Sequence, residues 1–245
     1  QDEAYRAKLQ SLDACGSWED VPSDAKDKLV RLGVVIDQII EEFQLDALAL
    51  RCWIEMQKHL GISPCVLLGE LNDRGMAAAC EVDVGNAVSM HALRLATYSP
   101  SMCLDWNNNY GDEDDKCILF HCGPVPKSLM KEPGKIVDHA ILANAVGEGH
   151  SYGCNVGRIA PGAFTFASMM TAEGRLRFYL GEGEFTTDPI PADFFGCAGV
   201  AQIPRLQDVL LHVGRNGYRH HVSAAFGKVV APLQEALSTY LGFEV

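Results

Sequence analysis

The chain has 245 residues, of which 48% are hydrophobic and 21% are charged, the proportions of an ordinary folded protein. Its 32 acidic and 20 basic residues give a formal net charge of −12, which argues against binding to nucleic acid or to an anionic membrane. The sequence has no apolar stretch near the roughly 18 residues of a membrane helix and no signal-peptide pattern at its start, so we expect a cytoplasmic protein. Because the chain begins with Gln1 and not with Met, we also expect it to be a piece of a longer protein.

The nine cysteines form no C-x-x-C pair, which argues against a zinc knuckle and against a thiol-redox protein. Most of them lie in apolar runs, so we expect small buried side chains in a reducing compartment. His121-Cys122 fits either a nucleophilic pair or a buried structural pair, and the second interpretation is favoured because a nucleophilic pair needs adjacency in space.

Helix and strand patterns alternate over the first 100 residues. Helical spacing of apolar residues predicts helices over 25–43, 66–71 and 84–95, the second of them opened by Pro64. Short apolar runs at 47–50 and 76–80 predict buried strands between these helices. This alternation is typical of a parallel sheet, so residues 1–100 are predicted to form a partial parallel α/β layer.

Short apolar runs separated by Gly, Pro and Asn dominate residues 101–245. Strands are expected at 117–120, 163–170 and 222–226, and alternating residues at 175–180 predict a half-buried strand. Helices are expected near 205–213 and at the C-terminus, where Val229, Leu233, Leu237, Tyr240 and Leu241 are predicted to share one apolar face. The fold class is therefore predicted to be α/β, with a β-rich, barrel-like C-terminal domain and flanking helices, divided near residue 100.

Three carboxylates follow predicted strands of the first segment. Glu55 is expected just after a strand that ends near Cys52-Trp53, and Glu81 and Asp83 follow the strand at 76–80. Ligands bind at the carboxyl edge of parallel sheets, so these side chains could share one crevice. The alternative is that each is an ordinary N-cap or first-turn acid of a helix.

His220-His221 precedes the strand expected at 222–226. A histidine beside paired carboxylates, with no thiolate, is a ligand set that favours Mn²⁺ or a similar divalent cation. The alternative is that the two rings alternate across the strand, one solvated and one in a packed network. A calcium loop at Asp105–Gly111 is rejected, because its glycine comes one position late and position twelve would be Lys116.

These motifs, in this order, resemble the metal-binding core of the L-fucose and L-arabinose isomerases. The similar stretches are Trp53–Met56, the E-x-D element Glu81–Asp83 with the helix that follows, Phe120–Gly123, and Arg219–Phe226. The resemblance implies a metal-dependent aldose–ketose isomerase that acts on a pentose or 6-deoxyhexose through an enediolate. Glu55, Asp83 and His221 would be the metal ligands, and Glu55 and Asp83 also the catalytic pair. Glu81 and His220 would hold the ligands in position without binding the metal themselves. Glu81 is the alternate metal ligand.

The resemblance covers roughly residues 45–245, and members of this family carry further N-terminal α/β domains. It therefore implies a C-terminal portion, with residues 1–100 the remainder of a middle domain. Its partners would be a small sugar, the missing N-terminal domains, and other copies of the chain in a trimer or hexamer. The alternative function is a non-catalytic carbohydrate-binding or regulatory domain of the same fold.

Overall fold

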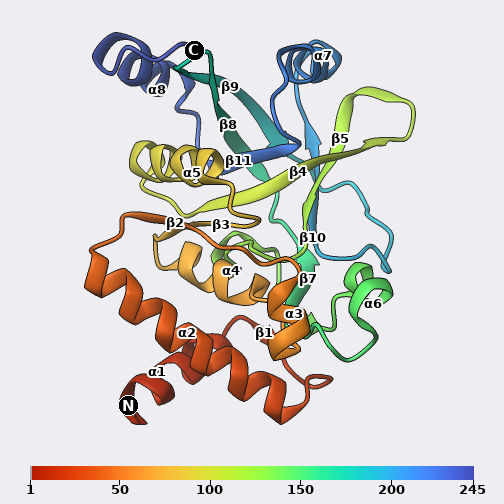
Figure 1. Cartoon of the computed structure of the whole chain (residues 1–245). Coiled ribbons are helices and arrows are strands. Elements are labelled where there is room, and N and C mark those ends of the chain that lie inside the picture. Colours follow the sequence, from red (N-terminus) through yellow and green to blue (C-terminus); the bar gives the residue numbers. More distant parts are fainter. Residues whose placement is uncertain (1) are drawn as a thin grey trace.

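The computed structural model describes residues 2–245, apart from the side chain of Asn108, and has a mixed α/β fold (Figure 1). Its helices are α1 (Asp2–Asp13), α2 (Ser23–Phe43), α3 (Glu55–Leu60), α4 (Cys65–Asp73), α5 (Val84–Thr97), α6 (Ala140–Val146), α7 (Leu206–Asn216) and α8 (Val230–Glu235), with a 3-10 turn at Lys127–Leu129 and a π-helical turn at Ala236–Tyr240. Its strands are β1 (Gly16–Ser17), β2 (Ala47–Ala49), β3 (Ala77–Ala79), β4 (Ser101–Tyr110), β5 (Glu113–His121), β6 (Gly134–Val137), β7 (Cys154–Arg158), β8 (Gly162–Ala172), β9 (Arg175–Phe185), β10 (Cys197–Gln202) and β11 (His221–Phe226). No helix within residues 2–245 is both long and apolar enough to cross a membrane.

The predicted parallel α/β layer is present and small. β2 and β3 pair in parallel, with Ala47 opposite Ala77, and α4 lies on the connection between them. Gly75, at φ +85°, allows the tight turn from α4 into β3. The connection from β3 to α5 is short, so the acidic element that forms it lies at the carboxyl end of the strand.

The β-rich second half closes into a ring of strands, seen in the upper part of Figure 1. The order β10-β5-β4-β11-β8-β9 returns to β10 through the pairing of β9 with β10. Phe164, Phe166 and Phe185 are fully buried in one core cluster, and the rings of Phe164 and Phe185 stack 4.3 Å apart. The prediction of a β-rich C-terminal half with flanking helices is confirmed. Packing of α5 against β8 and β11 joins it to the α/β layer.

Three local predictions were wrong. The strand before Glu55 ends at Ala49, well before Cys52-Trp53. Tyr240 and Leu241 are 80% and 58% exposed, because the chain changes from α8 into a π-helical turn and the helical spacing is lost. β9 is buried on both sides where Phe178 and Tyr179 lie, since α7 and α8 cover opposite faces of the sheet there.

A buried ion pair anchors α1, a helix that the sequence analysis did not predict. Lys8 is 4% exposed, and its Nζ lies 2.9 Å from Oε2 of Glu70 and 2.7 Å from Oδ2 of Asp37. Glu70, on α4, also accepts a hydrogen bond from Ser11 and contacts Arg74. Each charged group has a partner of opposite sign, which offsets the cost of burying it.

Replacing Glu70 with Gln should lower the free energy of unfolding by about 3 kcal/mol, because Lys8 would keep its charge in the core with only Asp37 beside it. Urea denaturation followed by circular dichroism measures this. The control is Glu132→Gln at an exposed position, which should change stability by less than about 0.5 kcal/mol. Equal stability of the two variants would show that the buried network does not anchor α1.

Candidate functional site

The E-x-D element forms the turn between β3 and α5, and Asp83 is the N-cap of α5. Its Oδ1 accepts the backbone N–H of Asn86 at 2.9 Å. The N-cap alternative for this residue is therefore correct as a local description. It leaves the second oxygen, Oδ2, free for contacts across the molecule.

Asp83 and His221 meet even though 138 positions separate them in the chain. Oδ2 of Asp83 lies 2.9 Å from Nδ1 of His221 and 2.8 Å from Nε of Arg219. The side chains of Asp83 and His221 are 4% and 3% exposed. Burial opposes ionisation of Asp83, but the hydrogen bonds from His221 and from the Asn86 N–H, with the charge of Arg219, outweigh it and lower its pKa. Asp83 is therefore a carboxylate at neutral pH.

The other ring nitrogen of His221, Nε2, is buried and has no hydrogen-bond partner in the described part of the chain. It faces two carboxylates, with Oε2 of Glu81 at 3.6 Å and Oδ1 of Asp105 at 3.5 Å. Oδ1 of Asp105 is also buried and unpaired. Asp105 lies directly opposite His221 in the β4–β11 ladder. The sequence analysis missed its contribution, because it weighed this stretch only as a calcium loop.

The rings of His220 and His221 lie side by side, with their centroids 4.3 Å apart, and do not alternate across the strand. The side chain of His220 is 64% exposed, and its Nε2 lies 3.6 Å from Oδ1 of Asp105. The ligand atoms of Glu81, His220 and His221 lie within 4.8 Å of one another. The interpretation of one solvated and one packed ring is thus correct, but both rings face the same carboxylates.

Glu55 is the first residue of α3 and is not part of this cluster. Its carboxylate lies 3.2 Å from Nε of Arg51 and accepts the N–H of Ile54. Among the described residues, no group of potential metal ligands within 4.8 Å of one another includes it. Backbone N–H groups, its own first and then that of Ile54, lower the pKa of Glu55. The role predicted for Glu55 stays a prediction.

The backbone at the acidic element is strained. Glu81 and Val82 have φ values of +58° and +57°, a region that β-branched residues rarely adopt. Each such residue costs on the order of 1–3 kcal/mol, and strain of this kind occurs at binding and catalytic sites. Here it turns Glu81 toward His221 while Asp83 still caps α5.

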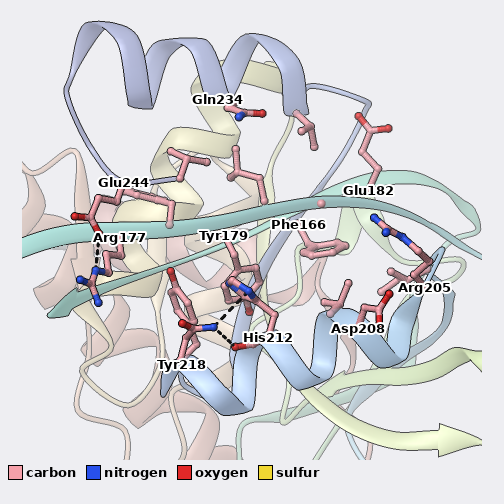
Figure 2. A pocket seen from close by; sticks show the side chains of 18 of the residues that line it. Phe166, Arg177, Tyr179, Glu182, Arg205, Asp208, His212, Tyr218, Gln234 and Glu244 are labelled. Carbon is pink, nitrogen blue, oxygen red and sulfur yellow. Dashed lines mark hydrogen bonds and ion pairs between the residues drawn. The ribbon is translucent and has the colours of Figure 1, made fainter.

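Two pockets lie on opposite faces of β8. A pocket of about 550 Å³ is bordered by Glu81, Asp83, His220 and His221, with Met169 and Thr171 from β8. Figure 2 shows a larger pocket of about 1140 Å³, to which the alternate β8 residues Phe166 and Met170 contribute. None of the predicted site residues lines the larger pocket, which lies between β9, α7 and the C-terminal segment.

The donor set of the smaller pocket fits a divalent cation. An unpaired buried imidazole nitrogen faces carboxylate oxygens, and none of the described residues that line the pocket is a cysteine; the Cys103 thiol lies behind His221 in the core. Imidazole and carboxylate ligands suit Mn²⁺ and similar ions. The contact between Asp83 and Nδ1 of His221 would orient the ring for a cation, as a carboxylate beside a ligating histidine does.

Comparisons with known proteins find that the chain is similar to sugar isomerases. A family model described as the L-fucose isomerase C-terminal domain matches residues 119–245. The chain is 25% identical over 210 residues to a sulfoquinovose isomerase of Priestia aryabhattai, covering 85% of this chain and 45% of that protein. It is 26% identical over 232 residues to a sulfoquinovose isomerase of Clostridium sp. (strain MSTE9), covering 94% of this chain and 50% of that protein. The chain thus spans about half the length of these curated relatives.

Gly85 is required for the approach of Arg219 to Asp83. A Cβ at residue 85 would lie 2.0 Å from a guanidinium nitrogen of Arg219 and 2.5 Å from the carbonyl oxygen of Met169. We expect Gly85→Ala to displace Arg219 and to lower the free energy of unfolding by about 1–3 kcal/mol.

The matched control is Gly214→Ala, also within a helix, where a Cβ would meet no atom within 4 Å. This substitution should raise the free energy of unfolding by about 0.5–1 kcal/mol. Thermal unfolding of both variants measures the two effects. A Gly85→Ala protein as stable as Gly214→Ala would contradict the assigned packing of Arg219.

Proposed function

The chain belongs to the family of proteins that carry the L-fucose isomerase C-terminal domain, and from that premise we propose that it is the C-terminal part of a metal-dependent aldose–ketose isomerase. The observation that carries the proposal is the environment of His221. A buried imidazole holds Asp83 on one nitrogen and leaves the other unpaired, facing Glu81 and Asp105. The family match includes β11, the strand that begins at His221.

The ligand set that we propose is Glu55, Asp83 and His221, with Glu81 as the alternate carboxylate. Support for Glu81 comes from its position 3.6 Å from Nε2 of His221, the nitrogen left for a cation. Asp83 lies at the other ring nitrogen, Nδ1, and would bind the cation by exchanging that contact. Glu55 would join by exchanging its contact with Arg51 for the cation. His220 borders the same pocket and would contribute from its solvent side.

Aldose–ketose conversion through an enediolate moves a proton between two adjacent carbons and another between their oxygens. A bound Mn²⁺ or similar divalent cation would supply positive charge that offsets the charge developing on those oxygens. Glu55 and Asp83 are the proposed bases that remove and return the carbon-bound proton. The lowered pKa keeps Asp83 ionised, and Arg219 fixes its Oδ2.

The substrate that we propose is a pentose or a 6-deoxyhexose, and the relatives named as sulfoquinovose isomerases add sulfoquinovose to the sugars to be tested. Since the chain covers about half of these relatives, the other half of such a protein would supply the remaining walls of the pocket. Assembly into a trimer or hexamer is part of the same proposal.

In the full-length protein, Asp83→Asn and Glu55→Gln should each reduce isomerisation by about 10³-fold, because the neutral amide cannot accept the carbon-bound proton. The measurement is ketose formation from the pentoses, the 6-deoxyhexoses and sulfoquinovose. Matched controls are Asp112→Asn and Glu132→Gln, which change exposed residues and should keep the activity. Undiminished turnover in either site variant would reject its catalytic role.

A full-length protein that binds a sugar and converts none would favour the non-catalytic alternative.

Replacing His221 with Ala should weaken Mn²⁺ binding by about 100-fold or more, because losing a ligand costs more than losing its orienting partner. Isothermal titration calorimetry measures this, with His59→Ala as an exposed control. The pair Asp83→Asn and Glu81→Gln then separates the two carboxylates, since the true ligand gives the larger loss of affinity. Binding that is unchanged in His221→Ala would remove this residue from the proposed set.

A further inference from the structure

A second cluster of potential ligands lies in the core, outside the proposed isomerase site. All nine cysteines are buried and free. Three of them come together with a histidine from a fourth segment of the chain. The members are Cys65 at the start of α4, Cys122 just after β5, His139 just before α6, and Cys154 at the start of β7.

The spacing of these side chains fits a tetrahedral ion. The sulfurs of Cys65 and Cys122 are 3.4 Å apart, and the ligand atoms of Cys65, Cys122 and His139 all lie within 4.8 Å of one another. Zn–S bonds of ~2.3 Å place two thiolates of a tetrahedral site ~3.8 Å apart. Cys154 lies outside this group of three and is buried beside Cys122. Cys154 further contacts the carbonyl oxygen of Cys122.

His139 provides an independent indication of a missing ligand. The residue is 0% exposed, and within the residues that the structure describes neither Nδ1 nor Nε2 of its ring has a hydrogen-bond partner. Its ring packs against Trp53 and Phe195, at centroid distances of 5.9 and 5.0 Å. A buried polar group without a partner costs about 1–3 kcal/mol. A bond from one ring nitrogen to a cation would remove part of that cost.

We propose that Cys65, Cys122, His139 and Cys154 bind one Zn²⁺ ion in a closed structural site. Three thiolates and one imidazole are a common ligand set for structural zinc, whereas Mn²⁺ prefers oxygen ligands. Burial of all four residues leaves no open coordination position for a substrate. Binding requires the thiols to lose their protons to solvent. The positive charge of the ion then balances the negative charge of the thiolates in the core.

Cys80 and His121 also lie within 4.8 Å of Cys122 and form a competing set. The state of the two histidines favours the first set. Nδ1 of His121 already accepts the backbone N–H of Cys122 at 2.8 Å, so the proton of its neutral ring is on Nε2; both nitrogens of His139 lack a partner among the described residues. Each set has a further thiol beside it, Cys154 beside Cys122 in the first and Cys52, 2.8 Å from Cys80, in the second. The competing set therefore becomes an outcome that the experiment distinguishes.

The proposed zinc site lies next to the proposed isomerase site and would hold parts of that site in position. Cys122 follows His121, whose ring lies 5.5 Å from the ring of His221. His139 contacts Trp53, two residues before Glu55. One ion would thus fix two segments that lead into the proposed sugar site. The proposal does not depend on the isomerase activity, because its ligands and its readouts are separate.

The first experiment uses the unaltered protein, purified under reducing conditions without chelator. Elemental analysis should find about one zinc per chain. Replacement by Co²⁺ should produce the thiolate-to-cobalt charge-transfer absorption of a tetrahedral site, and removal of the metal should lower the thermal unfolding midpoint. The proposal is overturned if neither Zn²⁺ nor Co²⁺ binds stoichiometrically, if bound Co²⁺ shows no thiolate absorption, or if Cys65 and Cys122 form a disulfide in place of the metal site.

Variants then identify the ligands. Cys65→Ser and His139→Phe should retain less than about a tenth of the zinc, and Phe keeps the packing against Trp53 and Phe195. Cys117→Ser is the matched control, since Cys117 is a buried thiol outside the cluster, and Cys80→Ser tests the competing set. Both should keep the zinc, as should the double variant Asp83→Asn with His221→Ala. Loss of zinc in Cys80→Ser with retention in Cys65→Ser, or loss in the double variant, would overturn the proposal. If Cys65→Ser does not fold, His139→Phe and the Co²⁺ spectrum of the unaltered protein decide.

Discussion

The contact between Asp83 and His221 is the interaction on which the candidate site depends. It joins the turn that ends the small parallel layer to the first residue of β11 in the strand ring. Both side chains are almost fully buried, and Arg219 and the Asn86 N–H complete the hydrogen bonding of the Asp83 carboxylate. A buried carboxylate and imidazole held in this way are preorganised, because the surrounding fold fixes their orientation before any ligand arrives.

The closed strand ring makes this contact possible. β11 lies between β4 and β8, so its position is fixed on both edges by ladder hydrogen bonds. The same ladder places Asp105 opposite His221, which adds a third carboxylate to the cluster. Packing of α5 on β8 and β11 brings the acidic turn to the end of the ring. The small pocket is thus formed where two structural units meet, while the larger pocket uses the other face of β8.

Local patterns predicted most elements correctly. Helices at Ser23–Phe43 and Val84–Thr97 and the strands β2, β3, β8 and β11 follow from apolar periodicity and from turn residues, which act over a few positions. The sequence analysis did not predict the strands β1, β4, β6, β7 and β10 or the helices α1, α3 and α6. It also failed at Tyr240 and Leu241, because a π-helical turn changes which residues face the core.

The sequence by itself determined the α/β class, the acidic turn after β3 and the histidine at the start of β11, because these depend on short-range periodicity and on motif order. Only the tertiary structure decided which groups meet. It brought Asp105 to His221 through strand register, left Glu55 beside Arg51, and gathered Cys65, Cys122 and His139, which no C-x-x-C pair indicates. The physical reason is that ligand clusters of this kind are formed by packing between segments far apart in the chain. A short stretch of sequence does not show which distant segments will pack together.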